Sequence, residues 1–309
     1  MKSIGKALLA APALLWLVAP TASWACACGC GIFEVGANAI MPSTTDTNMF
    51  LEYDFMDQNK NWSGTKSAPA ADNDDKEIKT DFFTLGGQTM LNEDWSVMAQ
   101  VPVSNRLFMT DDGAGVEAFT HAAFGDLRLK AIYTGFSSDR TTGAIFGVKL
   151  PTGDFTYANF DRDTEIGSGS TDALLGLYHS GALASGSPWV WFGQVMWDKP
   201  LASQGGYTPG AEFDAALGVA YTNVAVSSDV AITPTLQILG SSRIRDGGPE
   251  AAPSDSGYDR LLLSPGVEVA FNRWKLYGDV ELPIYQRMNG NQLVAQQLFK
   301  FVVSYDLDG

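Results

Sequence analysis

The segment 124–154 constrains the fold most strongly, because its side chains alternate strictly between apolar and polar. In its first half Leu127, Leu129 and Tyr133 take one parity of position, and Arg128 and Lys130 take the other. Successive side chains of a β-strand point to opposite faces, so this pattern predicts a strand with one apolar and one charged face. A polar turn at 137–140 and a second alternating run at 144–150 complete a predicted hairpin. Whether the apolar face meets protein or lipid depends on the rest of the chain.

The same period-two pattern predicts about twelve strands. Their approximate ranges are 47–57, 78–90, 95–103, two strands within 124–150, 171–183, 189–198, 211–222, 230–240, 258–271, 273–285 and 295–307. Long connections are expected at 57–77, 104–122, 151–170, 199–210, 241–257 and 286–294, and short ones at 91–94, 136–141, 184–188, 223–229 and 271–273. A meander with long loops at one end and short turns at the other is typical of outer-membrane barrels. The chain is therefore predicted to be all-β, a transmembrane antiparallel up-and-down β-barrel.

Aromatic residues and strand length favour this barrel over a soluble β-sandwich. Aromatic side chains near strand ends, which suit the two membrane interfaces, are Trp95, Tyr133, Trp189, Trp197, Tyr221, Trp274 and Tyr305. The predicted strands run to about ten residues, and their connections show no Greek-key crossover. Closure into a barrel would also remove the exposed edges of so much β-structure.

The N-terminus predicts export. Lys2 and Lys6 precede an apolar run at 8–18, and small residues around 23–25 form a cleavage signal, as in a secretory signal peptide. We expect three parts: a signal peptide at 1–25, a Cys-rich periplasmic segment at 26–46, and an outer-membrane barrel at 47–309. The expected location is the outer membrane of a Gram-negative cell, surrounded by lipid and lipopolysaccharide. The formal net charge of −15 argues against nucleic acid as a partner.

Residues in and after the hairpin also resemble a known family. GDLRLKAIY at 125–133, GVKLPTGD at 147–154 and GSGSTDALLGLYHSG at 167–181 are similar to the outer-membrane family named for the MetA pathway of phenol degradation. The resemblance extends over about 47–307 and lies in strand, turn and loop-entry residues. It implies a barrel-forming, transporter-like protein associated with aromatic or other hydrophobic compounds. The Cys-rich N-terminal segment departs from that family's general pattern.

The polar face of the strands is expected to line the lumen. The predicted lining residues are Glu52, Asp54, Asp81, Asp126, Arg128, Lys130, Lys149, Glu212, Asp214, Glu268, Lys275, Asp279 and Glu281. Both signs are interleaved, so neighbouring strands can pair charges. Two alternatives stay open. The charges either pack into a closed structural interior, or leave a narrow hydrated path whose sign selects the small-molecule cargo of a channel.

The three cysteines, Cys26, Cys28 and Cys30, lie within five residues. Their number is odd, and a disulfide between residues two apart is strained, so at least one thiol is expected to be unpaired. Soft thiolates select Cu(I) or zinc, which gives the alternative function of a barrel that binds or transports a soft metal. Two further interpretations are lipidation of Cys26 and a disulfide-linked plug that folds into the periplasmic mouth through Ile32, Phe33 and Val35.

No enzyme is predicted. The only histidines are His121 and His179, and no residues complete a catalytic triad around them. Asp161, Asp163 and Glu165 alternate as calcium ligands often do, but the full EF-hand pattern is missing, which favours a solvated acidic loop.

Overall fold

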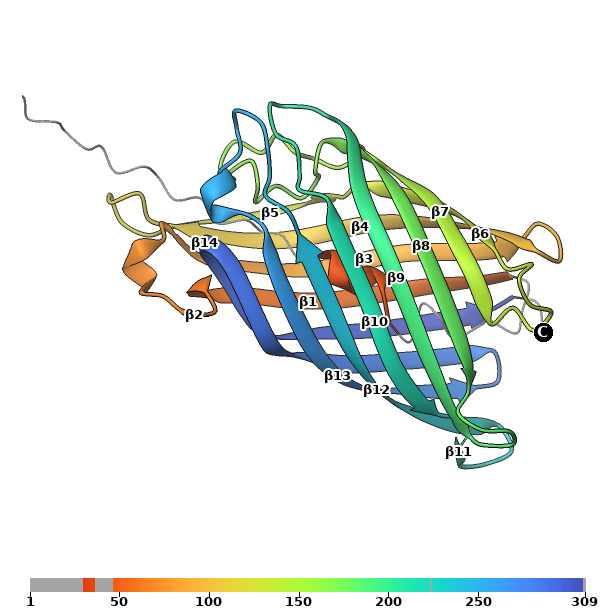
Figure 1. The fold of residues 1–309 in the computed structure, drawn as a ribbon. Coiled ribbons are helices and arrows are strands. Elements are labelled where there is room, and N and C mark those ends of the chain that lie inside the picture. The colour runs from red at the N-terminus through yellow and green to blue at the C-terminus, as the bar shows by residue number, and fades with distance from the viewer. Residues whose placement is uncertain (1–29, 37–46, 223, 308–309) are drawn as a thin grey trace, which may run out of the picture.

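The computed structural model describes residues 30–36, 47–222 and 224–307, and within them the strands form a closed antiparallel β-barrel (Figure 1). Eleven strands of the described chain make the wall: β1 (Thr47–Gly64), β3 (Asp75–Met90), β4 (Trp95–Thr110), β6 (Leu127–Tyr133), β7 (Thr142–Leu150), β8 (Ser170–Ala182), β9 (Trp189–Ser203), β10 (Glu212–Tyr221), β12 (Val230–Arg243), β13 (Tyr258–Phe271) and β14 (Trp274–Asp306). Pairing of β1 with β14 and of β10 with β12 closes the ring. The predicted all-β antiparallel barrel is confirmed.

β14 is labelled as one element but runs as two antiparallel arms, so the ring of eleven labelled strands has the twelve antiparallel segments that the sequence predicts. Its first arm, 274–288, pairs with β13, and its second arm, 291–306, pairs with β1. The Asp306 N–H donates to the Arg273 carbonyl at 2.9 Å, so the two arms lie side by side. The strands predicted at 273–285 and 295–307 are these two arms, and a tight turn at Gly290, whose φ is 65°, joins them. The long loop predicted at 286–294 is wrong.

Three short strands lie outside the ring: β2 (Lys66–Ser67) pairs with β1, β5 (Glu117–Phe124) with β4, and β11 (Val224–Ala225) with β12. Strands β1 and β4 are longer than predicted, so much of the loops expected at 57–77 and 104–122 is strand. The helices are single 3₁₀ turns, η1 (Cys30–Glu34), η2 (Ala70–Asp72) and η3 (Pro253–Asp255). None of the helices in the described ranges has the length and apolar character needed to cross a membrane.

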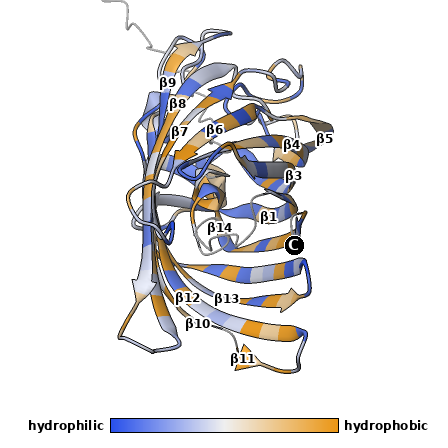
Figure 2. Cartoon of the chain, turned by 90° about the vertical axis from the view of Figure 1, so that its right-hand side faces the viewer, coloured by the Kyte–Doolittle hydropathy of each residue, from blue (hydrophilic) through white to orange (hydrophobic). Residues whose placement is uncertain are grey.

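The outer face of the barrel is apolar, as the alternating pattern predicts. Leu129 and Phe146 point outward and are 40% and 48% exposed, whereas Lys130 and Lys149 point inward and are buried. The resulting stripes of hydrophilic and hydrophobic residues along the strands are visible in Figure 2. Pairs of aromatic side chains lie on the outer surface at the short-turn end. The distances between ring centroids are 5.0 Å for Trp95 and Tyr133, 5.0 Å for Trp189 and Tyr221, and 4.7 Å for Trp274 and Tyr305. This surface suits a lipid bilayer and its interface.

We predict that Leu217→Arg destabilises the barrel in lipid. Leu217 lies in the middle of β10 and is 61% exposed on the outer face. An arginine near the middle of the bilayer costs about 2–4 kcal/mol, and the cost falls toward zero at the interface. The free energy of unfolding by urea in lipid vesicles, followed by tryptophan fluorescence, should fall by that amount. Val226→Arg, in the exposed turn after β11, is the matched control and should leave it nearly unchanged. Equal losses in both variants would contradict a lipid-facing β10.

Candidate functional site

Residues 30–36 lie inside the barrel, and we call this segment the plug (Figures 1 and 2). Ile32, Phe33 and Val35 are 0%, 5% and 1% exposed. They form one buried apolar cluster with inward-pointing side chains of the wall, namely Met56, Phe82, Ile132, Ile145, Leu174, Met196, Ala216, Leu239, Leu262, Ala295 and Leu298. The insertion expected for Ile32, Phe33 and Val35 is therefore observed, whereas the disulfide linkage of that segment stays a prediction.

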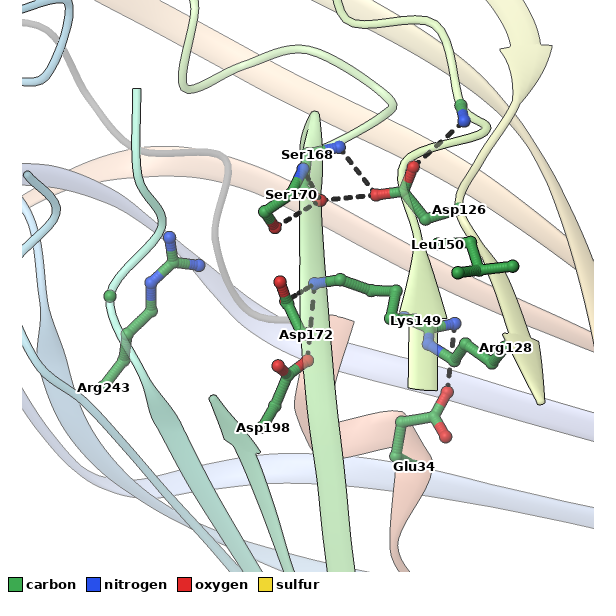
Figure 3. A network of polar contacts seen from close by, with 12 residues as sticks. Glu34, Asp126, Arg128, Lys149, Leu150, Ser168, Ser170, Asp172, Asp198 and Arg243 are labelled. Atoms are coloured by element: carbon green, nitrogen blue, oxygen red, sulfur yellow. Dashed lines mark hydrogen bonds and ion pairs between the residues drawn. The ribbon is translucent and has the colours of Figure 1, made fainter. Parts of the chain in front are cut away.

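Polar contacts hold the plug from several sides. The Glu34 carboxylate pairs with Arg128 at 3.1 Å and with the Lys130 ammonium, both on β6 (Figure 3 shows the first pair). Lys300 on β14 donates to the Phe33 carbonyl. On β9, the Gln194 amide donates to the Glu34 carbonyl and accepts from the Gly36 N–H, each at 3.3 Å. The wall thus provides apolar packing for the plug and partners for its polar groups.

Glu34 is the strongest anchor. Burial by itself would raise the pKa of this carboxyl group, but Arg128 and Lys130 outweigh burial and hold the pKa at about 2, below its usual 4.5. A carboxyl group with a lowered pKa stabilises the native arrangement above its ordinary pKa, and this stabilisation is lost as the pH falls toward the lowered value. The anchor is therefore fully charged above about pH 4.5 and is lost only as the pH approaches 2.

A cavity of about 150 Å³ lies between the plug and the long-loop end of the barrel, and we call it the outer cavity. Its lining includes five basic side chains, Arg106, Arg128, Lys149, Arg162 and Arg243, and twice as many carboxylates. Figure 3 shows the ion pairs of one basic group: the Lys149 ammonium lies between the carboxylates of Asp172 and Asp198, the latter at 3.4 Å. The outer cavity is therefore rich in charge, with an excess of acid.

The connection between β7 and β8, residues 151–169, covers the outer cavity. Asp126 accepts hydrogen bonds from the Gly153 N–H at 3.0 Å and the Ser168 N–H at 2.8 Å, which ties both ends of the connection to the wall (Figure 3). His121 on β5 pairs with Asp154 at 2.9 Å. These contacts hold the connection in place beside β5 and β8, two strands that do not pair with each other.

One carboxyl group in this connection is tuned to neutral pH. Burial, reinforced by the nearby Asp154, raises the pKa of Glu165 to about 7. The outer cavity thus gains one negative charge as the pH rises through 7. Asp163 and Glu165 are 8% and 9% exposed, so the expectation of a solvated acidic loop at Asp161, Asp163 and Glu165 is wrong. In the described residues no group of His, Cys, Asp and Glu is arranged to hold a metal ion.

On the short-turn side of the plug lies a second cavity of about 160 Å³, the inner cavity. Polar groups on its wall include Glu34, Lys130 and Gln194. Its apolar lining residues are Phe33, Phe50, Met98, Ile132, Ile145, Tyr178, Tyr277 and Val302. The lumen is thus divided by the plug into an acidic outer cavity and an amphipathic inner cavity.

Most of the predicted lining residues point inward. The outer cavity is lined by Glu52, Asp54, Asp126, Arg128, Lys149, Glu212 and Asp214, and the inner cavity by Glu52, Lys130, Glu268 and Lys275. Asp279 and Glu281 are buried in β14, near Lys300. Whether these residues contact cargo stays a prediction.

Asp81 requires a correction. The buried positions of β3 are Thr80, Phe82 and Thr84, so Asp81 has the opposite parity. It accepts a hydrogen bond at 2.8 Å from the hydroxyl of Tyr53, whose ring packs against exposed Phe83. The parity assigned to 78–90 was inverted because the charges at its start lie near the long-loop end, where the outer face is no longer apolar.

Among the predicted metal ligands, Cys26 and Cys28 lie outside the described residues, and Cys30 is described only as the first residue of η1. Sequence reasoning missed Glu34, Gln194, Arg106 and Arg243. The one usable signal was Glu34, a single acid within the apolar stretch 32–35.

Comparisons with known proteins establish the fold. No protein-family model and no curated protein matches the chain. Among solved structures, the COG4313 outer membrane channel from Pseudomonas putida F1 is similar, with a TM-score of 0.63 and 14% identity over 88% of this chain and 99% of that one. The β-domain of the Bordetella autotransporter BrkA gives a TM-score of 0.50 and 11% identity over 85% of this chain and 100% of that one. The chain has the fold of an outer-membrane β-barrel.

We predict that Glu34→Gln loosens the plug. The variant leaves Arg128 and Lys130 without their carboxylate, and breaking a buried ion pair in this way costs about 3–5 kcal/mol. The open probability of single channels in planar bilayers should rise. Glu93→Gln, in the exposed turn between β3 and β4, is the matched control. If both variants conduct like the wild type at neutral pH, Glu34 does not hold the lumen closed.

Proposed function

We propose that this chain is an outer-membrane channel for small molecules that carry a hydrophobic, for example aromatic, part. In a membrane, a barrel of this fold would direct its lumen across the bilayer, and the cavities on both sides of the plug would provide successive positions for a solute. The MetA-pathway resemblance points to the same class of compound. The similar solved structure of a channel from Pseudomonas putida supports the fold on which this proposal rests.

The observation that carries the proposal is an apolar cluster beside the inner cavity, which contributes Phe50, Tyr178, Tyr277 and Val302 to the lining of that cavity. Phe192, Ala220, Tyr277 and Val302 pack together, with Phe50 and Tyr178 against them. The interior of a membrane barrel is normally polar. Plug packing accounts for the apolar residues clustered with the plug, but this second cluster contains no plug residue. A hydrophobic solute would give these side chains the apolar contact that water does not.

The size of the inner cavity limits the solute. Its volume of about 160 Å³ is close to that of an apolar cavity of about 150 Å³ that holds one benzene molecule. A single aromatic ring therefore fits without movement of the wall. Passage between the two cavities requires the plug to shift, because Phe33 and Glu34 contribute to the lining of both.

We predict that Val302→Thr slows the uptake of benzyl alcohol. A hydroxyl without a partner in an apolar cluster costs about 1 kcal/mol, roughly fivefold in rate. Uptake would be measured in vesicles whose outer leaflet is lipopolysaccharide, with glycerol as the polar reference solute. Val303→Thr is the matched control, because Val303 is adjacent but 37% exposed on the outer face. Uptake by the wild type no faster than by protein-free vesicles would refute the channel, and equal uptake by both variants would refute the role of the cluster.

The soft-metal barrel is the second candidate. Cys30 begins the plug, and the next residue, Gly31, lines the outer cavity. We predict that protein purified after exposure to copper or zinc carries metal that the Cys26→Ser, Cys28→Ser, Cys30→Ser triple variant lacks. Elemental mass spectrometry of both proteins measures this. Equal metal content would remove the thiols from consideration.

A further inference from the structure

The charges of the outer cavity are unbalanced in a way that points to the sign of the cargo. The carboxylates in its lining outnumber the basic groups two to one. An enclosed site has a lower effective dielectric constant than water, so an excess of one sign acts strongly on any ion that enters. We propose that the outer cavity binds the positively charged group of a solute, an organic ammonium. This rests on the proposed channel function and names the class of solute.

Two buried carboxylates identify where such a group would bind. Asp54 on β1 and Asp214 on β10 each line the outer cavity and are only 3% exposed. In each, the Oδ1 atom is buried and has no hydrogen-bond partner. Leaving a buried charged oxygen without a partner is costly. A bound ammonium has three N–H donors that could supply the missing hydrogen bonds.

Each basic group of the cavity has at least one acceptor within the protein, although Nε and Nη1 of Arg162 and Nε of Arg243 are also buried without a hydrogen-bond partner among the described residues. Lys149 contacts Asp172 and Asp198, and Arg128 contacts Glu34. Arg243 pairs with Asp246 at 2.7 Å. Arg106 donates to the Glu165 carbonyl at 2.9 Å, and Arg162 to the Ser168 carbonyl at 2.7 Å. Each cation therefore has a fixed acceptor within the protein.

The plug forms the inner boundary of this acidic site through Gly31. A Cβ atom at this position would lie 2.6 Å from Glu212 Oε1 and 2.8 Å from Asp214 Oδ2. Only glycine lets the plug backbone come this close to the two carboxylates. A cation at Asp214 would thus lie against the plug, at the passage between the two cavities.

The first test measures ion selectivity. Reversal potentials of the wild type in planar bilayers under a potassium chloride gradient should show that K⁺ permeates better than Cl⁻. Asp54→Asn and Asp214→Asn should each reduce the K⁺ to Cl⁻ permeability ratio by about threefold or more, since each removes an acidic group from the lumen at nearly constant shape. Asp229→Asn, in the exposed turn before β12, removes the same net charge outside the cavity and should leave the ratio unchanged. Heat-modifiable gel migration confirms that each variant is folded.

The second test separates this inference from the channel function. Benzylamine, benzyl alcohol and benzoate share one ring and differ in charge, so their uptake into the same lipopolysaccharide vesicles isolates the effect of sign. We expect benzylamine to compete with K⁺ current and to enter faster than benzoate, with the difference reduced in Asp214→Asn. A wild type that prefers Cl⁻, or takes up benzylamine and benzoate equally, overturns the ammonium site. If benzyl alcohol still enters in that case, the channel function stands; if no ring compound enters, the channel function fails as well.

Discussion

Closure of the backbone hydrogen-bond ladder is the constraint on which this structure depends. Within lipid, every strand N–H and C=O group needs a partner, and an open sheet would leave two edges without one. Here β14 pairs with β13 through one arm and with β1 through the other, which joins the last part of the sheet to the first. Once the ring is closed, each strand has one face toward lipid and one toward the lumen, and the alternation of side chains follows.

A closed ring of this size leaves an interior that wall side chains alone do not fill. Barrels of eight strands are just filled by their own side chains, and wider ones enclose space. In this chain the plug supplies the missing packing: Ile32, Phe33 and Val35 take the place of a core. Inward-pointing apolar residues of the wall, such as Met56 and Leu298, pack in the same cluster as the plug, and charged residues of the wall lie on either side. The plug therefore determines both where the lumen is closed and where its two cavities lie.

The fold could be predicted from local pattern because the lipid-facing side of a strand repeats every second residue. The pattern failed where that reason no longer applied. Asp81 lies beyond the apolar part of β3, so its parity could not be taken from hydrophobicity, and the turn at Gly290 is too tight to appear as a loop. Asp54 and Asp214 were recognisable as lumen residues. That they lack partners, while Lys149 and Arg128 have theirs, depends on contacts between strands and plug segments far apart in sequence, which no single segment encodes.

The same charges link closure of the lumen to its contents. Withdrawal of the plug would take the Glu34 carboxylate away from both Arg128 and Lys130 on β6. It would also take the Phe33 carbonyl away from Lys300, which retains Glu52 at 3.8 Å. Because buried charges without partners are costly, such a displacement is favourable only if water or an incoming solute reaches these groups. A solute that relieves the carboxylates beside Gly31 while it displaces the plug lowers that cost. Under the proposed function, the plugged state is the resting state of the lumen, and a solute in the outer cavity favours opening.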